Sequence, residues 1–238
     1  MEKVQPLPAS QKPGGLPAGI EVIFFDIDGT LAETDDYYSG ILQKALKPLL
    51  FFLSDERISW LAHKLIMFSQ TPIDMFYWLL DKVGLDRSFT RLTEHFSSRE
   101  SRYTYNLVAD AHETLAALSP HFRLGIITAG GAKTAAAFLN RYQLSSFFEI
   151  VVTAQTVART KPDPLPLLYA AEQLGVKPKA CLMIGDTVFD LKTAQRAGAA
   201  FIGVRTGFDH DWLLKMFGAE TTLDSVRSLP AFLGILAA

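Results

Sequence analysis

Residues 22–31 read Val-Ile-Phe-Phe-Asp-Ile-Asp-Gly-Thr-Leu, and this stretch decides the fold. Four consecutive apolar residues bounded by a turn are typical of a buried strand, because the run is too short for a helix. The strand leads into Asp26 and Asp28, and side chains two positions apart on a strand point the same way. Two carboxylates crowded together repel each other unless one is protonated or a cation lies between them. The stretch indicates either an acidic turn or a site that uses both acids.

The composition is that of a globular protein without a nucleic-acid or membrane partner. The 238 residues suffice for a sizeable core and a second small domain, and 49% of them are hydrophobic. A net charge of −2 gives no basic surface for nucleic acid or anionic lipid. The single cysteine, Cys181, excludes an internal disulfide and is expected to be buried and unreactive. No uncharged apolar stretch approaches the roughly 18 residues that span a bilayer, so we expect a cytoplasmic protein.

Three kinds of segment follow one another along the chain. Residues 1–19 are rich in proline and glycine and lack the apolar region of a signal peptide, which predicts a flexible leader. Residues 34–106 are rich in leucine and aromatic residues at helical rather than alternating spacing, which predicts a small all-α unit. This unit interrupts a core formed by residues 20–33 and 107–238.

The core alternates between strand and helix patterns. After the first strand we expect strands at residues 122–128, 149–153, 181–186 and, last, 200–204. Helices are expected at residues 112–118, 132–142, 164–174 and 188–197. Such alternation predicts an α/β fold with a doubly wound parallel sheet that is covered by helices on both faces.

Polar residues collect where these strands end, which is where open parallel sheets bind their ligands. Thr128 ends one strand, Asp186 ends another, and Lys161 and Asp190 lie in or near the adjoining loops. Carboxylate oxygens with one ammonium are typical of a site for a hard cation and a phosphate. Mg²⁺ would relieve the repulsion between Asp26 and Asp186. The backbone N–H groups of a glycine pair that opens a helix, residues 130–131, would face an anion.

Each of these residues also has a structural explanation when it is taken alone. Thr128 could simply end a strand, and Lys161 could be a solvated surface lysine. Asp186 and Asp190 could cap the helix that follows. Residues 205–208, Arg-Thr-Gly-Phe, are expected to form only a turn.

Together, four motifs resemble the haloacid dehalogenase superfamily across about residues 20–210. They are the acidic motif at residues 26–31, Thr128, the pair Lys161-Pro162, and Gly-Asp-Thr-Val-Phe-Asp at residues 185–190. The helical insertion looks like the family's cap domain, placed after the first strand. Among members, the chain is most similar to the phosphoglycolate phosphatase-like group.

The resemblance implies a role for each acid. Asp26 is expected to be the nucleophile that forms an aspartyl-phosphate, and Asp28 the general acid and base. Mg²⁺ is expected to bind to Asp26, Asp186 and Asp28, the last through its backbone carbonyl. Asp190 is expected to support the metal site or the lysine.

The resemblance also assigns the phosphate-binding residues and the reaction. Thr128, Ala129, Gly130 and Lys161 are expected to bind the phosphoryl group, with Thr128 and Lys161 catalytic. The implied function is Mg²⁺-dependent hydrolysis of a small phosphorylated metabolite, a phosphomonoester such as phosphoglycolate. A phosphomutase of the β-phosphoglucomutase type shares the same core residues, and a catalytically silent interaction protein is a third possibility. The sequence leaves the oligomeric state open.

Overall fold

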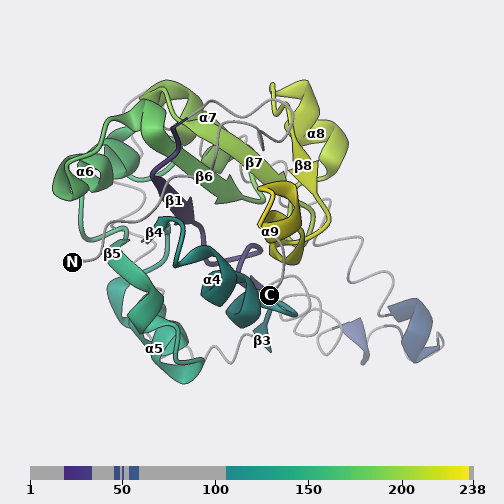
Figure 1. Ribbon diagram of the computed structural model, residues 1–238. Coiled ribbons are helices and arrows are strands. Elements are labelled where there is room, and N and C mark those ends of the chain that lie inside the picture. The colour runs from purple at the N-terminus through teal and green to yellow at the C-terminus, as the bar shows by residue number, and fades with distance from the viewer. Residues whose placement is uncertain (1–18, 34–45, 49, 51–53, 59–105, 236–238) are drawn as a thin grey trace. The chain divides into compact units, whose positions relative to one another are not determined.

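The computed structural model describes residues 19–33, 46–48, 50, 54–58 and 106–235 (Figure 1). By its contacts the chain divides into two units, one of Met1–Glu33 with Asn106–Ala238 and one of Thr34–Tyr105. The predicted leader and nearly all of the predicted helical cap lie outside the described residues. These domain assignments therefore stay predictions, and the unit that carries the candidate site is described by itself.

The sheet of this unit has six parallel strands in the order β5-β4-β1-β6-β7-β8. The strands are β1 (Val22–Phe25), β4 (Arg123–Ile127), β5 (Phe148–Val152), β6 (Cys181–Gly185), β7 (Ala200–Val204) and β8 (Thr222–Leu223). The chain builds outward from β1 on one side through β4 and β5, and on the other through β6, β7 and β8. The strand order therefore reverses beside β1, which is where α/β sheets form their ligand crevices.

Helices cover both faces of the sheet, and the predicted α/β class is confirmed. The helices are α4 (Ala111–Leu118), α5 (Ala132–Arg141), α6 (Leu165–Leu174), α7 (Val188–Ala197), α8 (Asp211–Met216) and α9 (Leu229–Phe232). Side chains of α6 and α7 pack with Val22 and Phe24 in one buried cluster. Ile23 and Phe25 point to the opposite face, where they are also fully buried. Helix α4 packs against α9 on that opposite side (Figure 1).

Two short pairings were absent from the prediction. Residues 200–204 were expected to be the last strand, but β8 adds a sixth through the pairs Gly203–Thr222 and Val204–Leu223. A separate antiparallel pair joins β2 (Ala32–Glu33) to β3 (Asn106–Leu107). Strands of two residues are too short to show an alternating pattern, so the sequence carried no periodic signal for them.

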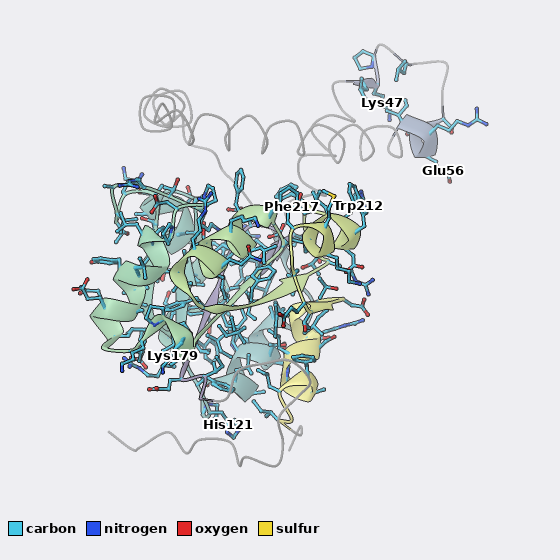
Figure 2. The ribbon with its side chains drawn as sticks, turned by 90° about the horizontal axis from the view of Figure 1, so that it is seen from above. Lys47, Glu56, His121, Lys179, Trp212 and Phe217 are labelled. Atoms are coloured by element: carbon cyan, nitrogen blue, oxygen red, sulfur yellow. The ribbon has the colours of Figure 1, made fainter. Side chains whose placement is uncertain are left out.

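Two large aromatic side chains are exposed at one end of the unit (Figure 2). Figure 2 shows His121 and Lys179, which precede β4 and β6, far from Trp212 and Phe217 in and after α8. Trp212 is 61% exposed and Phe217 39% exposed. Among the described helices, none is long and apolar enough to cross a bilayer.

Close packing between β1 and β4 gives a first prediction. A Cβ on Gly125 of β4 would lie 2.7 Å from the Phe24 ring and 2.9 Å from Ile150 Cγ2. We expect Gly125→Ala to lower the free energy of unfolding by about 1–3 kcal/mol, because the core must shift to admit the methyl group. Urea denaturation measures this loss. Val151→Ala, at a partly exposed position of β5, is the control and should change stability by less than about 0.5 kcal/mol. Unchanged stability of Gly125→Ala would contradict the packing described.

Candidate active site

Three buried carboxylates meet at the carboxyl ends of the strands. Because β1 and β6 are neighbours, the residues that follow them, Asp26 and Asp186, are brought together. Asp190 joins them from the first turn of α7, and one carboxylate oxygen from each of the three lies within 4.8 Å of the others. Asp26 is 5% exposed and the other two are fully buried. The structure thus brings together three of the acids that the sequence singled out.

Lys161 supplies positive charge to this cluster. Its Nζ lies 2.8 Å from Asp26 Oδ1 and 2.6 Å from Asp190 Oδ1, and the residue is 8% exposed. Burial alone would lower the pKa of Lys161, but the Asp190 and Asp26 carboxylates outweigh it and raise the pKa above its ordinary value. The lysine therefore stays charged at neutral pH and is not a solvated surface residue.

Asp190 binds a different partner with each of its two carboxylate oxygens. Its Oδ2 accepts hydrogen bonds from Thr187 N at 3.1 Å and Thr187 Oγ1 at 2.7 Å, within a capping box at the start of α7. Its Oδ1 accepts from Lys161. The helix-capping explanation of this residue is therefore correct, its contact with Lys161 is compatible with the predicted supporting role, and both of its oxygens are engaged by the protein.

Asp186 is held by residues to which the sequence had given no role. Its Oδ1 accepts a hydrogen bond from Thr30 Oγ1 at 3.1 Å, and its Oδ2 accepts one from Phe208 N at 2.9 Å. Phe208 belongs to the segment that was expected to be only a turn. Its donor is a backbone N–H, which almost every residue carries, so the sequence offered no signal for this contact.

Thr128, Gly130 and Asp28 form the second part of the site. Gly130 N donates a 2.9 Å hydrogen bond to Thr128 Oγ1. A Cβ on Gly130 would lie 3.2 Å from Thr128 Oγ1 and 3.7 Å from Asp28 Oδ2, so these groups surround the glycine. Asp28 is partly buried and its side chain is not one of the three clustered carboxylates. Ala129 is exposed.

The start of α5 has a partner that the sequence did not reveal. Gln155 Oε1 accepts a 2.6 Å hydrogen bond from Ala132 N, the first amide of α5. The exposed Gln155 thus lies beside Gly131, one of the two glycines expected to face an anion. A single glutamine in a loop carries no pattern that would assign it this place.

The electrostatics of the cluster call for more positive charge than Lys161 provides. Burial raises the pKa of Asp26 to about 7, although Lys161 lowers it, and burial together with Asp190 and Asp26 raises the pKa of Asp186 well above its ordinary value. Burial also raises the pKa of Asp28, against the opposing effect of Lys161. Carboxylates that cannot all ionise together bind a cation or a proton.

A hard divalent cation fits the residues present. The available donors are carboxylate oxygens, which Mg²⁺ prefers. Asp26 Oδ1 is buried and has the Lys161 ammonium beside it, but the described residues offer it no donor in hydrogen-bonding geometry. A cation beside Asp26 and Asp186 would stabilise their charged forms, which burial and repulsion between carboxylates disfavour, so that the pKa of both groups is raised.

Comparison with known proteins identifies the family. The sequence model of the haloacid dehalogenase-like hydrolases matches residues 23–204, most of the chain. The chain belongs to the haloacid dehalogenase-like hydrolase family. It is therefore a hydrolase by family, as the four strand-end motifs indicated.

Relatives of this hydrolase resemble it over nearly their whole length. It is 26% identical over 216 residues to the pyrophosphatase PpaX of Oceanobacillus iheyensis, covering 90% of this chain and 97% of the relative. It is 28% identical over 216 residues to a phosphoglycolate phosphatase of Colwellia psychrerythraea, covering 88% of this chain and 95% of the relative.

Solved structures of the family share the fold. A haloacid dehalogenase-superfamily hydrolase of Geobacter sulfurreducens matches 92% of this chain and 99% of its own, with a TM-score of 0.58 and 22% identity. The L-2-haloacid dehalogenase of Xanthobacter autotrophicus matches 92% of this chain and 100% of its own, with a TM-score of 0.61 and 18% identity. A haloacid dehalogenase thus shares the fold of a chain whose sequence relatives are named as phosphatases. The reaction must therefore be argued from the site.

The raised pKa of Asp26 predicts how the metal-free hydrolase responds to pH. Native Asp26 keeps its proton up to about pH 7, whereas the ordinary value is 3.8. Between these values the native state binds more protons than the unfolded state, so the free energy of unfolding should fall as pH rises. One such group contributes a slope of up to about 1.4 kcal/mol per pH unit. Buried Asp209, with a pKa raised by burial to about 6, acts in the same direction.

Urea denaturation in EDTA at pH 5, 6, 7 and 8 measures this slope. The control is Asp26→Asn, which has no proton to lose at this position and should show a shallower decline. A free energy of unfolding that rises through this range would contradict the charge balance described for the site.

Proposed function

We propose that the protein is a Mg²⁺-dependent phosphatase that hydrolyses a small phosphomonoester through an aspartyl-phosphate on Asp26. The observation that carries the proposal is the buried cluster of Asp26, Asp186 and Asp190, two of which pair with the buried Lys161. A second acid, Asp28, lies beside the Thr128–Gly130 turn. The names of the relatives, a pyrophosphatase and a phosphoglycolate phosphatase, support phosphate esters or anhydrides as the substrate class.

The cation would be held by Asp26 and Asp186, with the backbone carbonyl of Asp28. Asp186 accepts a hydrogen bond from one neutral donor at each oxygen. Asp190 is the less suitable ligand because the Lys161 ammonium already pairs with one of its oxygens and two Thr187 donors hold the other, so we assign it to supporting the lysine. When bound, Mg²⁺ would neutralise carboxylate charge and polarise the phosphoryl group. The residues of the chain perform the remaining chemistry.

In the first step Asp26 attacks phosphorus. An Asp26 oxygen–phosphorus bond forms, the phosphorus–oxygen bond of the ester breaks, and Asp28 gives its proton to the leaving oxygen. The raised pKa of Asp28 suits this role, because the group must still hold a proton when the ester bond breaks.

Thr128 and Lys161 would bind the oxygens of the phosphoryl group during this step. Thr128 Oγ1 accepts from Gly130 N, which leaves its own proton free to be donated to a phosphoryl oxygen. The charged Lys161 would offset the negative charge that develops.

In the second step water replaces Asp26 on phosphorus. Asp28, now a carboxylate, takes a proton from the attacking water as the new oxygen–phosphorus bond forms and the bond to Asp26 breaks. Inorganic phosphate leaves, and both acids return to their starting states. If a second hydroxyl of the substrate took the place of water, the same residues would give a phosphomutase, so the products distinguish the two reactions.

Removing the nucleophile tests the mechanism. Asp26→Asn should lower kcat by about 10³-fold or more, because the amide cannot form the phosphoenzyme. Phosphate release from p-nitrophenyl phosphate measures turnover. Asp110→Asn, at an exposed residue that makes no cap hydrogen bond, is the matched control and should keep wild-type activity. Near wild-type turnover by Asp26→Asn would overturn the assignment.

Removing the cation tests the cofactor. With phosphoglycolate, pyrophosphate and hexose phosphates as substrates, EDTA should abolish phosphate release and added Mg²⁺ should restore it. The same reactions analysed for isomerised sugar phosphates separate hydrolysis from mutase chemistry. Full activity in EDTA would refute the metal role of Asp186, and isomerisation without phosphate release would refute the phosphatase.

A further inference from the structure

The segment of residues 205–209, between β7 and α8, contacts three separate parts of the candidate site. Thr206 Oγ1 donates a 2.7 Å hydrogen bond to Gly29 O, in the turn that follows Asp28. Phe208 N donates to Asp186 Oδ2. Asp209, 5% exposed, accepts a 2.6 Å hydrogen bond from Val188 N, the first residue of α7. We call residues 205–209 the β7–α8 segment.

The Thr206 hydrogen bond acts on the turn that follows the two leading acids. Gly29 lies in the left-handed region, with φ of 74°, and its N–H donates to Ala32 O within the turn. Its carbonyl, which belongs to the peptide that leads into Thr30, is bonded from outside the turn by Thr206. Fixing this peptide also fixes the next residue, Thr30, whose hydroxyl donates to Asp186 Oδ1. Thr206 therefore restrains the turn and, through Thr30, one oxygen of Asp186.

Gly207 encloses the other oxygen of Asp186. A Cβ on Gly207 would overlap Asp186 Oδ2 and would lie 2.7 Å from the Cα of Gly29. A Cβ on Gly29 would overlap the same oxygen from its own side. The two glycine backbones thus pack around one carboxylate oxygen. Gly207 is not among the described glycines with positive φ, so its backbone conformation would allow a side chain. A side chain is excluded there because Asp186 and Gly29 leave no room for it.

Asp209 extends the same restraint to α7. By accepting from the first amide of this helix it holds the N-terminus that presents Asp190, the third helical residue, to Lys161. One short segment therefore forms hydrogen bonds with the turn after Asp28, with Asp186 and with the start of α7.

We propose that the β7–α8 segment positions Asp186 for the cation, with Thr206 as a positioning residue and residue 207 as a place that admits no side chain. The proposal rests on the proposed function, from which the role of Asp186 as a metal ligand is taken. Groups that orient metal ligands typically contribute 10- to 100-fold to metal affinity or activity.

Two substitutions at Thr206 separate its hydrogen bond from its packing. Thr206→Val keeps the shape but loses the donor, and it should weaken Mg²⁺ binding and lower kcat by about tenfold. Thr206→Ser keeps the hydroxyl and should stay within about twofold of wild type. Thr193→Val is the matched control, because the buried Thr193 hydroxyl has no hydrogen-bond partner among the described residues.

Mg²⁺ binding is measured as the rise in Tm across a series of MgCl₂ concentrations, a readout that needs no turnover. The Tm of each variant in EDTA reports its stability without the metal. Loss of Mg²⁺ affinity in the valine variant and its retention in the serine variant would support the proposal. Wild-type Mg²⁺ affinity and kcat in Thr206→Val, or equal losses in both variants, would overturn it. A lowered Tm in EDTA with unchanged Mg²⁺ affinity would reduce Thr206 to a structural role and would also overturn it.

Gly207→Ala tests the steric enclosure independently. The added methyl group should displace the Asp186 carboxylate and weaken Mg²⁺ binding by more than Thr206→Val does. Wild-type Mg²⁺ affinity in Gly207→Ala would contradict the enclosure. These results are distinguishable from failure of the proposed function. A wild-type protein that binds Mg²⁺ but hydrolyses no phosphoester would refute the phosphatase while the variants still tested the positioning.

Discussion

The ion pairs of Lys161 with Asp26 and Asp190 are the interaction on which the candidate site depends. Buried carboxylates are costly unless they are paired, and here one ammonium serves two of them, with Nζ–oxygen distances of 2.8 and 2.6 Å. Asp186 lies within the same cluster and has hydroxyl and backbone N–H donors in place of a cationic partner. Burial, together with the neighbouring negative charge, raises the pKa of Asp26 and of Asp186 and makes a cation site the simplest way to complete the cluster.

The fold concentrates these groups with few elements. Strand β1 lies between β4 and β6, so Asp26, Thr128 and Asp186 follow three adjacent strands. Helix α7 packs against β6 and β7, and its capping box sets the Asp190 carboxylate toward Lys161. The β7–α8 segment donates hydrogen bonds both to Asp186 and to the turn after Asp28.

The sequence predicted those parts of the structure that repeat or that carry unusual chemistry. Strands β1, β4, β5, β6 and β7 are short apolar or β-branched runs that alternate with the segments of helices α4 to α7, and crowded acids at strand ends such as Asp26 indicated the candidate site. The contacts of Thr206 with Gly29, and of Gln155 with Ala132, join single polar atoms of residues distant in sequence, so no local pattern encodes them. Strand β8 was missed because two residues show no alternation.

The most direct test of the cation site is a crystal structure grown with Mn²⁺, which takes the same hard oxygen ligands as Mg²⁺ and scatters anomalously. An anomalous difference peak in contact with the carboxylates of Asp26 and Asp186 is the result we expect. Crystals grown in excess Mn²⁺ that show no peak there, with Lys161 alone pairing Asp26 and Asp190, would contradict the proposal that this buried cluster holds a divalent cation.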